Sequence, residues 1–216
     1  MNAKIQGVIF DLDGVLVSTD NCHYLAWKQM ADEENIPFDR KTNERLRGVS
    51  RMESLDIILE RATKDYSQEE RLAMAARKNA YYVKLIGSLS NTDLLPGALE
   101  TLAKLREQSI KIAIGSSSKN TPLILKQIGL SEAFDAIADG NAIHNSKPDP
   151  EVFLLAAELL KLSPQNCLVV EDADAGVEAA LAGGMRVLGV GSAASNARAT
   201  FTAEDLSHAN FRSMLQ

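Results

Sequence analysis

The sequence of 216 residues has little of what marks secreted, membrane-spanning or nucleic-acid-binding proteins. Its only cysteines, Cys22 and Cys167, lie far apart without metal-site spacing, so we expect free thiols in a reducing compartment. No apolar run approaches the ~18 residues of a membrane span, and the run broken at Asp11 is too short for a signal peptide. A net charge of −6 argues against a broad nucleic-acid surface. We therefore expect a cytoplasmic protein with neither membrane nor nucleic-acid partners.

The most informative stretch is Val-Ile-Phe-Asp-Leu-Asp-Gly at residues 8–14. Its apolar run predicts a strand that is buried on both faces. Asp11 and Asp13 are spaced i and i+2, so on an extended chain both carboxylates would aim at one small volume past the strand. Carboxylates this close share a proton or a cation, which makes one a candidate nucleophile and the other a candidate acid. The alternative is a polar turn, since Asp and Gly are common in turns.

The rest of the chain divides into a helical part and an alternating part. Residues 17–91 show apolar residues at helical spacing, and Ser67 with Glu70 has the pattern of a capping box. After residue 92, helical stretches alternate with strands expected at residues 110–114, 134–138, 167–170 and 187–190, and the segment after residue 190 is weakly patterned. This order predicts an α/β fold with a doubly wound parallel sheet, a Rossmann-like core. The core domain would comprise residues 1–16 and 92–216, with residues 17–91 inserted after the first strand as an all-helical cap domain.

Polar residues follow the predicted strands in turn. Asp11 follows the first strand and Ser116 the second, Lys147 lies in the loop after the third, and Glu171 and Asp172 follow the fourth. Ligands of open parallel sheets bind beyond the carboxyl ends of the strands, so we expect these side chains to meet at one edge.

The acidic members of this group, together with Asp13, form an oxygen-only set that suits Mg²⁺; the set is Asp11, Asp13, Glu171 and Asp172. Lys147 would supply a positive charge for a phosphoryl oxygen, and Ser116 a hydroxyl donor. The alternatives are an exposed lysine in a proline-rich turn and a helix-capping loop at residues 116–118.

Two other motifs are set aside. Residues 189–194 match a dinucleotide fingerprint, but too little chain follows to complete a βαβ unit. The serine run lacks a G-x-S-x-G elbow, and the sequence places none of His23, His144 and His208 as its base, so acyl hydrolysis is not expected.

The Asp-Leu-Asp-Gly motif at residues 11–14, the serine after the second strand, the lysine before a proline and the Glu171-Asp172 pair resemble the haloacid dehalogenase superfamily of phosphotransferases. Residues 46–51, residues 77–79 with 82–83, and residues 116–120 look like the β-phosphoglucomutase family within it. The resemblance covers the chain from the first strand to about residue 191. It implies an intramolecular phosphotransferase of the isomerase class, a phosphoprotein of carbohydrate metabolism that moves a phosphoryl group between the 1- and 6-oxygens of β-D-glucose through a bisphosphate.

The resemblance also implies a role for each matching residue. Asp11 would be the nucleophile that becomes an aspartyl phosphate, and Asp13 the general acid/base. Mg²⁺ would be held by Asp11, Asp172 and the backbone carbonyl of Asp13, with Glu171 supporting. The residues expected to bind the substrate or to take part in closure are Thr19, His23, Trp27, Arg51, Lys78, Ser116, Ser118, Lys119, Asn120 and Lys147.

Among these, Ser116 and Lys147 would bind the transferring phosphoryl group, and Lys78 with His23 would contact the sugar. The distal phosphate, which is the phosphate that is not being transferred, would be held by Arg51, Ser118 and Asn120. The partner would be a small sugar phosphate and the chain a monomer.

Two positions depart from the family pattern: Ser18 stands where an Asp is usual before the hinge Thr19, and Arg47 where a Lys is common. One alternative function is a sugar-phosphate phosphatase on the same scaffold, with water as the acceptor. A non-catalytic binding protein is the third possibility; it would be expected to lack Asp11, Asp13 or Lys147, and all three are present.

Overall fold

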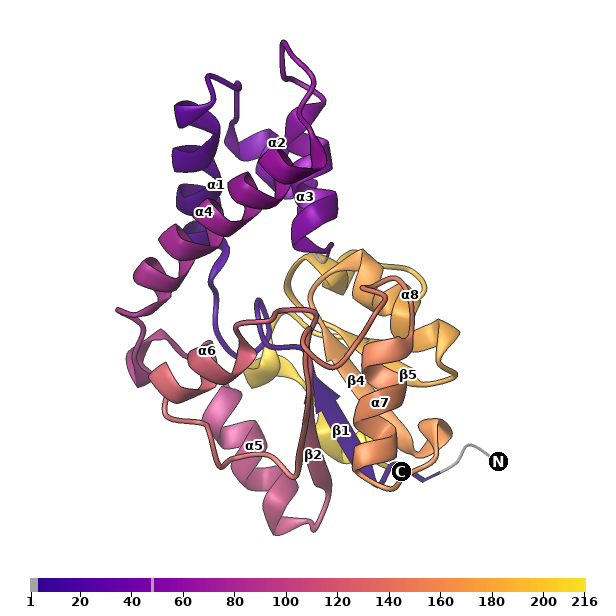
Figure 1. Ribbon diagram of the computed structural model, residues 1–216. Coiled ribbons are helices and arrows are strands. Elements are labelled where there is room, and N and C mark those ends of the chain that lie inside the picture. Colours follow the sequence, from indigo (N-terminus) through magenta and orange to yellow (C-terminus); the bar gives the residue numbers. More distant parts are fainter. Residues whose placement is uncertain (1–3, 48) are drawn as a thin grey trace.

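The computed structural model describes residues 4–47 and 49–216 (Figure 1). Residues 1–3 of the expected core domain and Gly48, which belongs to the motif at residues 46–51, lie outside the described residues. Within the described residues, parallel strands form one sheet in the order β3-β2-β1-β4-β5-β6, so the first strand along the chain is central. The strands are β1 (Gly7–Phe10), β2 (Lys111–Gly115), β3 (Ala136–Ala138), β4 (Cys167–Glu171), β5 (Arg186–Gly189) and β6 (Phe201–Thr202).

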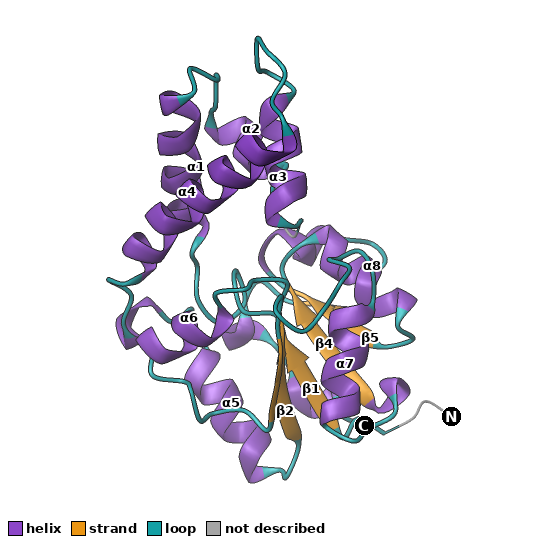
Figure 2. Ribbon diagram, viewed as in Figure 1, coloured by secondary structure: helices purple, strands orange, loops and turns teal. Residues whose placement is uncertain are grey.

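The predicted doubly wound sheet is confirmed by how the side chains of β1 divide between its two faces. Val8 and Phe10 pack in a core with α5 (Ala98–Glu107) and α6 (Thr121–Gln127). Ile9 packs on the other face with α7 (Glu151–Leu159) and α8 (Asp174–Ala182). All three side chains are fully buried, as expected of a parallel strand covered on both faces. Helices lie on both sides of the sheet (Figure 2).

The predicted strands match β1 to β5 with small shifts at their ends. Strand β6 was not predicted; it pairs with β5 through Leu188 opposite Phe201, and so short a strand gives no periodicity to detect. The chain then ends in α9 (Phe211–Met214), and the buried Met214 packs in the same core as α5. The weakly patterned tail therefore completes the sheet and covers one of its faces.

Residues 20–86 form the helices that lie beyond the carboxyl ends of the strands (Figure 1). The helices are α1 (Asp20–Glu33), α2 (Arg40–Glu44), α3 (Arg51–Leu59) and α4 (Gln68–Ile86). Helices α1, α3 and α4 share a hydrophobic cluster around Trp27, Met30 and Leu55, distinct from the two clusters on the sheet. The chain entering this segment pairs with the chain leaving it, since Leu95 N donates to Leu16 O at 2.9 Å. None of the described helices has the length and apolar character that a membrane crossing requires.

Candidate active site

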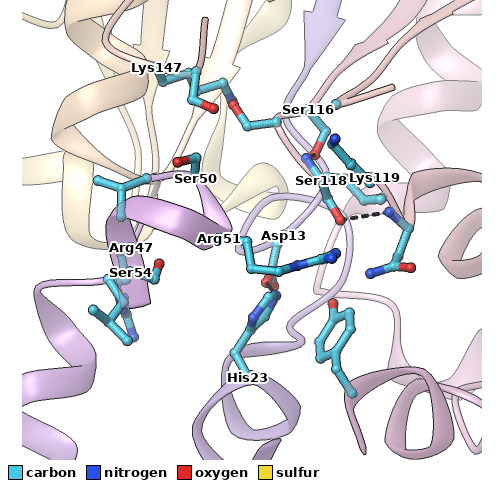
Figure 3. Close-up of a pocket in the computed structure, with 18 of the residues that line it drawn as sticks. Asp13, His23, Arg47, Ser50, Arg51, Ser54, Ser116, Ser118, Lys119 and Lys147 are labelled. Atoms are coloured by element: carbon cyan, nitrogen blue, oxygen red, sulfur yellow. Dashed lines mark hydrogen bonds and ion pairs between the residues drawn. The ribbon is translucent and has the colours of Figure 1, made fainter. Parts of the chain in front are cut away.

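A cleft of about 570 Å³ lies between the helices α1 to α4 and the carboxyl ends of the strands, and residues of both sides line it (Figure 3). The nominated residues that line it are Asp11, Asp13, His23, Trp27, Arg51, Lys78, Ser116, Ser118, Lys119, Asn120, Lys147, Glu171 and Asp172. Thr19, which we expected to bind substrate or to take part in closure, is fully buried and contacts Asp13. The topology therefore brings together residues that lie up to 161 positions apart, from Asp11 to Asp172.

Three carboxylates converge where β1 and β4 end. Asp11, Glu171 and Asp172 each offer an oxygen within 4.8 Å of the others. They meet because β1 and β4 are neighbouring parallel strands whose carboxyl ends share one edge. Two glycines make room for them: a Cβ on Gly14, which has φ +83°, would overlap the Asp172 carboxylate, and a Cβ on Gly176 would overlap that of Glu171.

Lys147 lies within this carboxylate cluster. Its Nζ donates to Asp11 Oδ1 at 2.5 Å and to Glu171 Oε2 at 2.8 Å, and only 3% of the residue is exposed. Burial alone would lower the pKa of Lys147, but the Asp11 and Glu171 carboxylates raise it above its usual value. Lys147 is therefore a fixed cation, and the alternative of an exposed lysine in a turn is wrong.

The oxygen set fits a divalent cation. Burial and the neighbouring negative charges raise the pKa of Asp172, and burial and Asp11 raise that of Glu171 against the opposing effect of Lys147. The backbone amides of Asp172 and Ala173 donate to Glu171 Oε1, and the Asp172 carboxylate offers an oxygen to the cluster. A hard cation would relieve the repulsion, and carboxylate oxygens are the ligands that such cations prefer.

Asp13 lines the same cleft as Asp11, but its carboxylate is held by Thr19 and is not one of the three that converge. Strand β1 ends at Phe10, and the chain then turns so that Asp13 bridges to Val17; the alternation of an extended strand does not reach it. The Asp13 carboxylate accepts from Thr19 N at 2.6 Å and from the Thr19 hydroxyl. Burial is the main cause that raises the pKa of Asp13 to about 6, which suits a group that must give and take a proton near neutral pH.

The helical side of the cleft carries a buried lysine beside a histidine. Lys78 is 2% exposed, and its Nζ lies 2.9 Å from His23 Nδ1 and 4.8 Å from the centre of the Trp27 ring. Burial and the Arg51 charge lower the pKa of Lys78 to about 7. Burial and the Lys78 charge also lower the pKa of His23, so this imidazole is neutral at neutral pH. His23 Nε2 lies 3.8 Å from Asp13 Oδ2, which places this pair next to the candidate acid (Figure 3).

One amide joins the two sides of the cleft. Asn79 Oδ1 in α4 accepts from Arg51 Nη2 at 2.7 Å and from Asn120 Nδ2 at 3.0 Å. The serine loop of the core is ordered beside it, because Ser118 Oγ accepts from Asn120 N and Ser116 Oγ accepts from Ser118 N. The N-cap of α6 is Asn120, which makes no side-chain cap hydrogen bond, so these serines do not cap the helix; their hydroxyls order the turn that leads into it.

Asn79 and Tyr82, which hydrogen-bond to nominated residues of the site, were not themselves among the sequence candidates. Tyr82 is 1% exposed, and its hydroxyl lies 2.9 Å from Thr19 Oγ1. Both lie in stretches that carry the family resemblance, and Tyr82 follows Lys78 by one helical turn, which places the two on the same face of α4. That spacing is the signal that could have nominated Tyr82; Asn79 has no comparable signal.

Comparison with known proteins decides the family. The family model of haloacid dehalogenase-like hydrolases matches residues 5–184. The chain belongs to the haloacid dehalogenase-like hydrolase family. Within this family it is 46% identical to a β-phosphoglucomutase of Bacillus subtilis, over 87% of this chain and 84% of that protein. It is 31% identical to a phosphorylated carbohydrates phosphatase of Thermotoga maritima, over 86% of this chain and 85% of that protein.

A solved structure of the family agrees with the fold. The crystal structure of a β-phosphoglucomutase from Clostridium difficile matches with a TM-score of 0.92 at 42% identity, covering 97% of this chain and 95% of that one. These similarities confirm the predicted superfamily and support an enzyme that transfers phosphoryl groups. Because the family includes both mutases and phosphatases, the cleft itself must indicate the acceptor.

Proposed function

We propose that the protein is a Mg²⁺-dependent phosphotransferase that interconverts β-D-glucose 1-phosphate and glucose 6-phosphate through an aspartyl phosphate and glucose 1,6-bisphosphate. The observation that carries the proposal is the presence of cationic side chains on both sides of one cleft. Lys147 lies on the core side, and Arg51 and Lys78 lie on the helical side. A sugar that carries a phosphate at each end needs one such group at each end, whereas hydrolysis of a monophosphate needs only the first.

The chemistry assigned to the core side starts from a phosphorylated Asp11. Its phosphoryl group passes to the 6-hydroxyl of β-glucose 1-phosphate, the bond from phosphorus to Asp11 Oδ breaks, and Asp13 takes the hydroxyl proton. The bisphosphate then turns over in the cleft, and Asp11 attacks the phosphate at the 1-position. The bond from phosphorus to that sugar oxygen breaks, Asp13 returns its proton to the oxygen, and glucose 6-phosphate leaves. Lys147 and Ser116 hold the transferring phosphoryl oxygens throughout.

Mg²⁺ is the cation we propose for the carboxylate cluster. Asp11, Glu171, Asp172 and the backbone carbonyl of Asp13 would hold it, and when bound it would neutralise charge on the phosphoryl group. The fixed charge of Lys147 complements that role, since it is present whether or not a cation is bound.

We further propose that residues 17–91 act as a cap domain over a core of residues 1–16 and 92–216. Closure of this cap would exclude water, so that the phosphoryl group reaches a sugar hydroxyl instead. The link from Arg51 through Asn79 to Asn120 supports this assignment, because it joins the helical side to the core beside the distal-phosphate residues. One chain supplies both sides of the cleft, so the proposal requires no second copy.

The second candidate is a sugar-phosphate phosphatase, and the Thermotoga maritima relative is the finding that favours it. The deciding experiment supplies β-glucose 1-phosphate, Mg²⁺ and a trace of glucose 1,6-bisphosphate, and measures glucose 6-phosphate and inorganic phosphate side by side. We expect glucose 6-phosphate to dominate. Dominant release of inorganic phosphate would replace the mutase assignment with the phosphatase.

A further inference from the structure

Tyr82 is a buried residue of α4 that contacts three residues around the candidate acid. Its hydroxyl lies 2.9 Å from Thr19 Oγ1, and its ring centre lies 4.1 Å from that of His23. Lys78 Nζ lies 4.6 Å from the centre of the same ring. With 1% of its surface exposed, Tyr82 is held in one place by these contacts. The proposed phosphoryl transfer assigns no role to Tyr82.

The hydrogen bonds around Thr19 fix which group donates. The Thr19 hydroxyl has a single hydrogen, and it donates this hydrogen to Asp13 Oδ2. The hydroxyl of Tyr82 must therefore donate to Thr19 Oγ1, and burial raises the pKa of Tyr82, which keeps that hydrogen in place. Since the Thr19 amide also donates to Asp13 Oδ1, one residue orients both carboxylate oxygens, and Tyr82 orients that residue.

We infer that Tyr82 is a positioning residue for the proton transfer of Asp13, acting through Thr19. The inference rests on the proposed function, in which Asp11 Oδ bonds to phosphorus, the bond from phosphorus to the leaving oxygen breaks, and the proton of Asp13 goes to that oxygen. Linked hydrogen bonds polarise one another, so the Tyr82 hydroxyl makes Thr19 a stronger and better-aligned donor. Its removal slows the proton transfer and leaves the attack of Asp11 unchanged.

The test compares two leaving groups in a Tyr82→Phe variant, which keeps the ring and removes only the hydroxyl. Phenyl phosphate needs a proton as its poor leaving group departs, whereas p-nitrophenyl phosphate releases a stable anion that needs none. The ratio kcat/KM reports the steps up to that departure. We expect kcat/KM to fall about fivefold for phenyl phosphate, the effect of one hydrogen bond, and to stay near the wild-type value for p-nitrophenyl phosphate.

Two further variants separate positioning from a general structural role. Tyr81→Phe removes the neighbouring hydroxyl of α4, which donates to Glu33 at 2.7 Å on the surface, and should leave both rates unchanged. Thr19→Val removes the hydroxyl that links Tyr82 to Asp13. In this background, Tyr82→Phe should cause no further loss of kcat/KM for phenyl phosphate. Additive losses, or equal losses for both substrates, would overturn the inference.

The aryl phosphates contain no sugar, so this test does not depend on which acceptor the enzyme uses. A wild-type protein that releases mainly inorganic phosphate from β-glucose 1-phosphate would contradict the mutase assignment and leave the positioning inference standing. Unchanged rates for phenyl phosphate in Tyr82→Phe would sink the inference and leave the mutase assignment intact.

Discussion

The two sides of the cleft hold their charges in different ways. On the core side, Lys147 is hydrogen-bonded to Asp11 and Glu171, so opposite charges lie in direct contact. On the helical side, the polar partners of Arg51 and Lys78 are neutral, and burial lowers the pKa of both cations. The core side is thus assembled before any ligand arrives, whereas Arg51 and Lys78 have no bonded counter-charge among the described residues.

This difference in charge pairing suggests a different role in ligand binding for each side of the cleft. A buried cation without an adjacent carboxylate is unfavourable, and an anionic ligand removes the penalty. A phosphate bound at Arg51 would offset the Arg51 charge that acts on Lys78 and so stabilise the charged form of Lys78. In the proposed function, binding of the distal phosphate and engagement of the helical side would therefore be coupled. In the proposed function, the core side performs the chemistry and the helical side recognises the rest of the substrate.

The largest effect should come from breaking the core side at Asp11. Asp11→Asn keeps the shape of the side chain and removes the nucleophile, so we expect turnover to fall by at least about 10³-fold. Lys147 keeps Glu171 as a partner, so the variant should remain folded by circular dichroism. Asp65→Asn, at an exposed position of the helical segment, is the matched control. Turnover of Asp11→Asn near the wild-type rate would refute the nucleophile assignment.

The second largest effect should come from a substitution on the helical side, at Arg51. Arg51→Ala removes a charged group from the proposed distal-phosphate site, so we expect interconversion of the glucose phosphates to fall by roughly 100-fold. Hydrolysis of p-nitrophenyl phosphate, which has no second phosphate, should change by less than about threefold. Arg45→Ala removes an exposed arginine that pairs with Glu60, and serves as the control for charge. Equal losses of activity in both assays would mean that Arg51 does not bind the distal phosphate.

A third experiment measures how the buried charge of Lys78 on the helical side affects the free energy of unfolding. The pKa of Lys78 falls from 10.5 to about 7 on folding, so the unfolded chain binds more protons between these two values. The free energy of unfolding should therefore rise with pH across this window, by up to about 1.4 kcal/mol per unit. Lys78→Met removes this dependence, and we expect the variant to be more stable than wild type at pH 7, with a difference that shrinks toward pH 10. Urea unfolding of both proteins at pH 7 and pH 9 measures the difference between their free energies of unfolding. If this difference does not change with pH, Lys78 keeps its ordinary pKa.

The fold was predictable because its signals are local. Strands β1, β2 and β4 are short apolar runs that are followed by Asp or Ser or end in Glu, and the parallel order follows from the helices between the strands. The carboxylate cluster was predictable for the same reason, since the ends of neighbouring parallel strands share an edge. Strand β6 was not, because its two residues become a strand only by pairing with β5.

The details of the site that were missed depend on tertiary contacts. Asp13 turns toward Thr19 because the chain bends after Phe10, and the i, i+2 spacing carries no information about that bend. Asn79 and Tyr82 matter because α4 passes over the N-termini of α1 and α6, where they meet Thr19 and Asn120. Helical periodicity shows which face of α4 these residues share, but not what that face meets.

The smallest effect concerns how helix α4 of the helical side is held at its start. Ser67 Oγ accepts from Glu70 N, and the Glu70 carboxylate accepts from Ser67 N at 2.7 Å, which confirms the predicted capping box. At the start of α1 the Thr19 hydroxyl bonds to Asp13 instead of capping its helix. Ser67→Ala should therefore lower the free energy of unfolding by about 1 kcal/mol with turnover unchanged, measured by urea unfolding and by kcat. Because Ser67 lies three helical turns from Lys78, a fall in kcat would mean that the cationic side of the cleft depends on the whole length of α4.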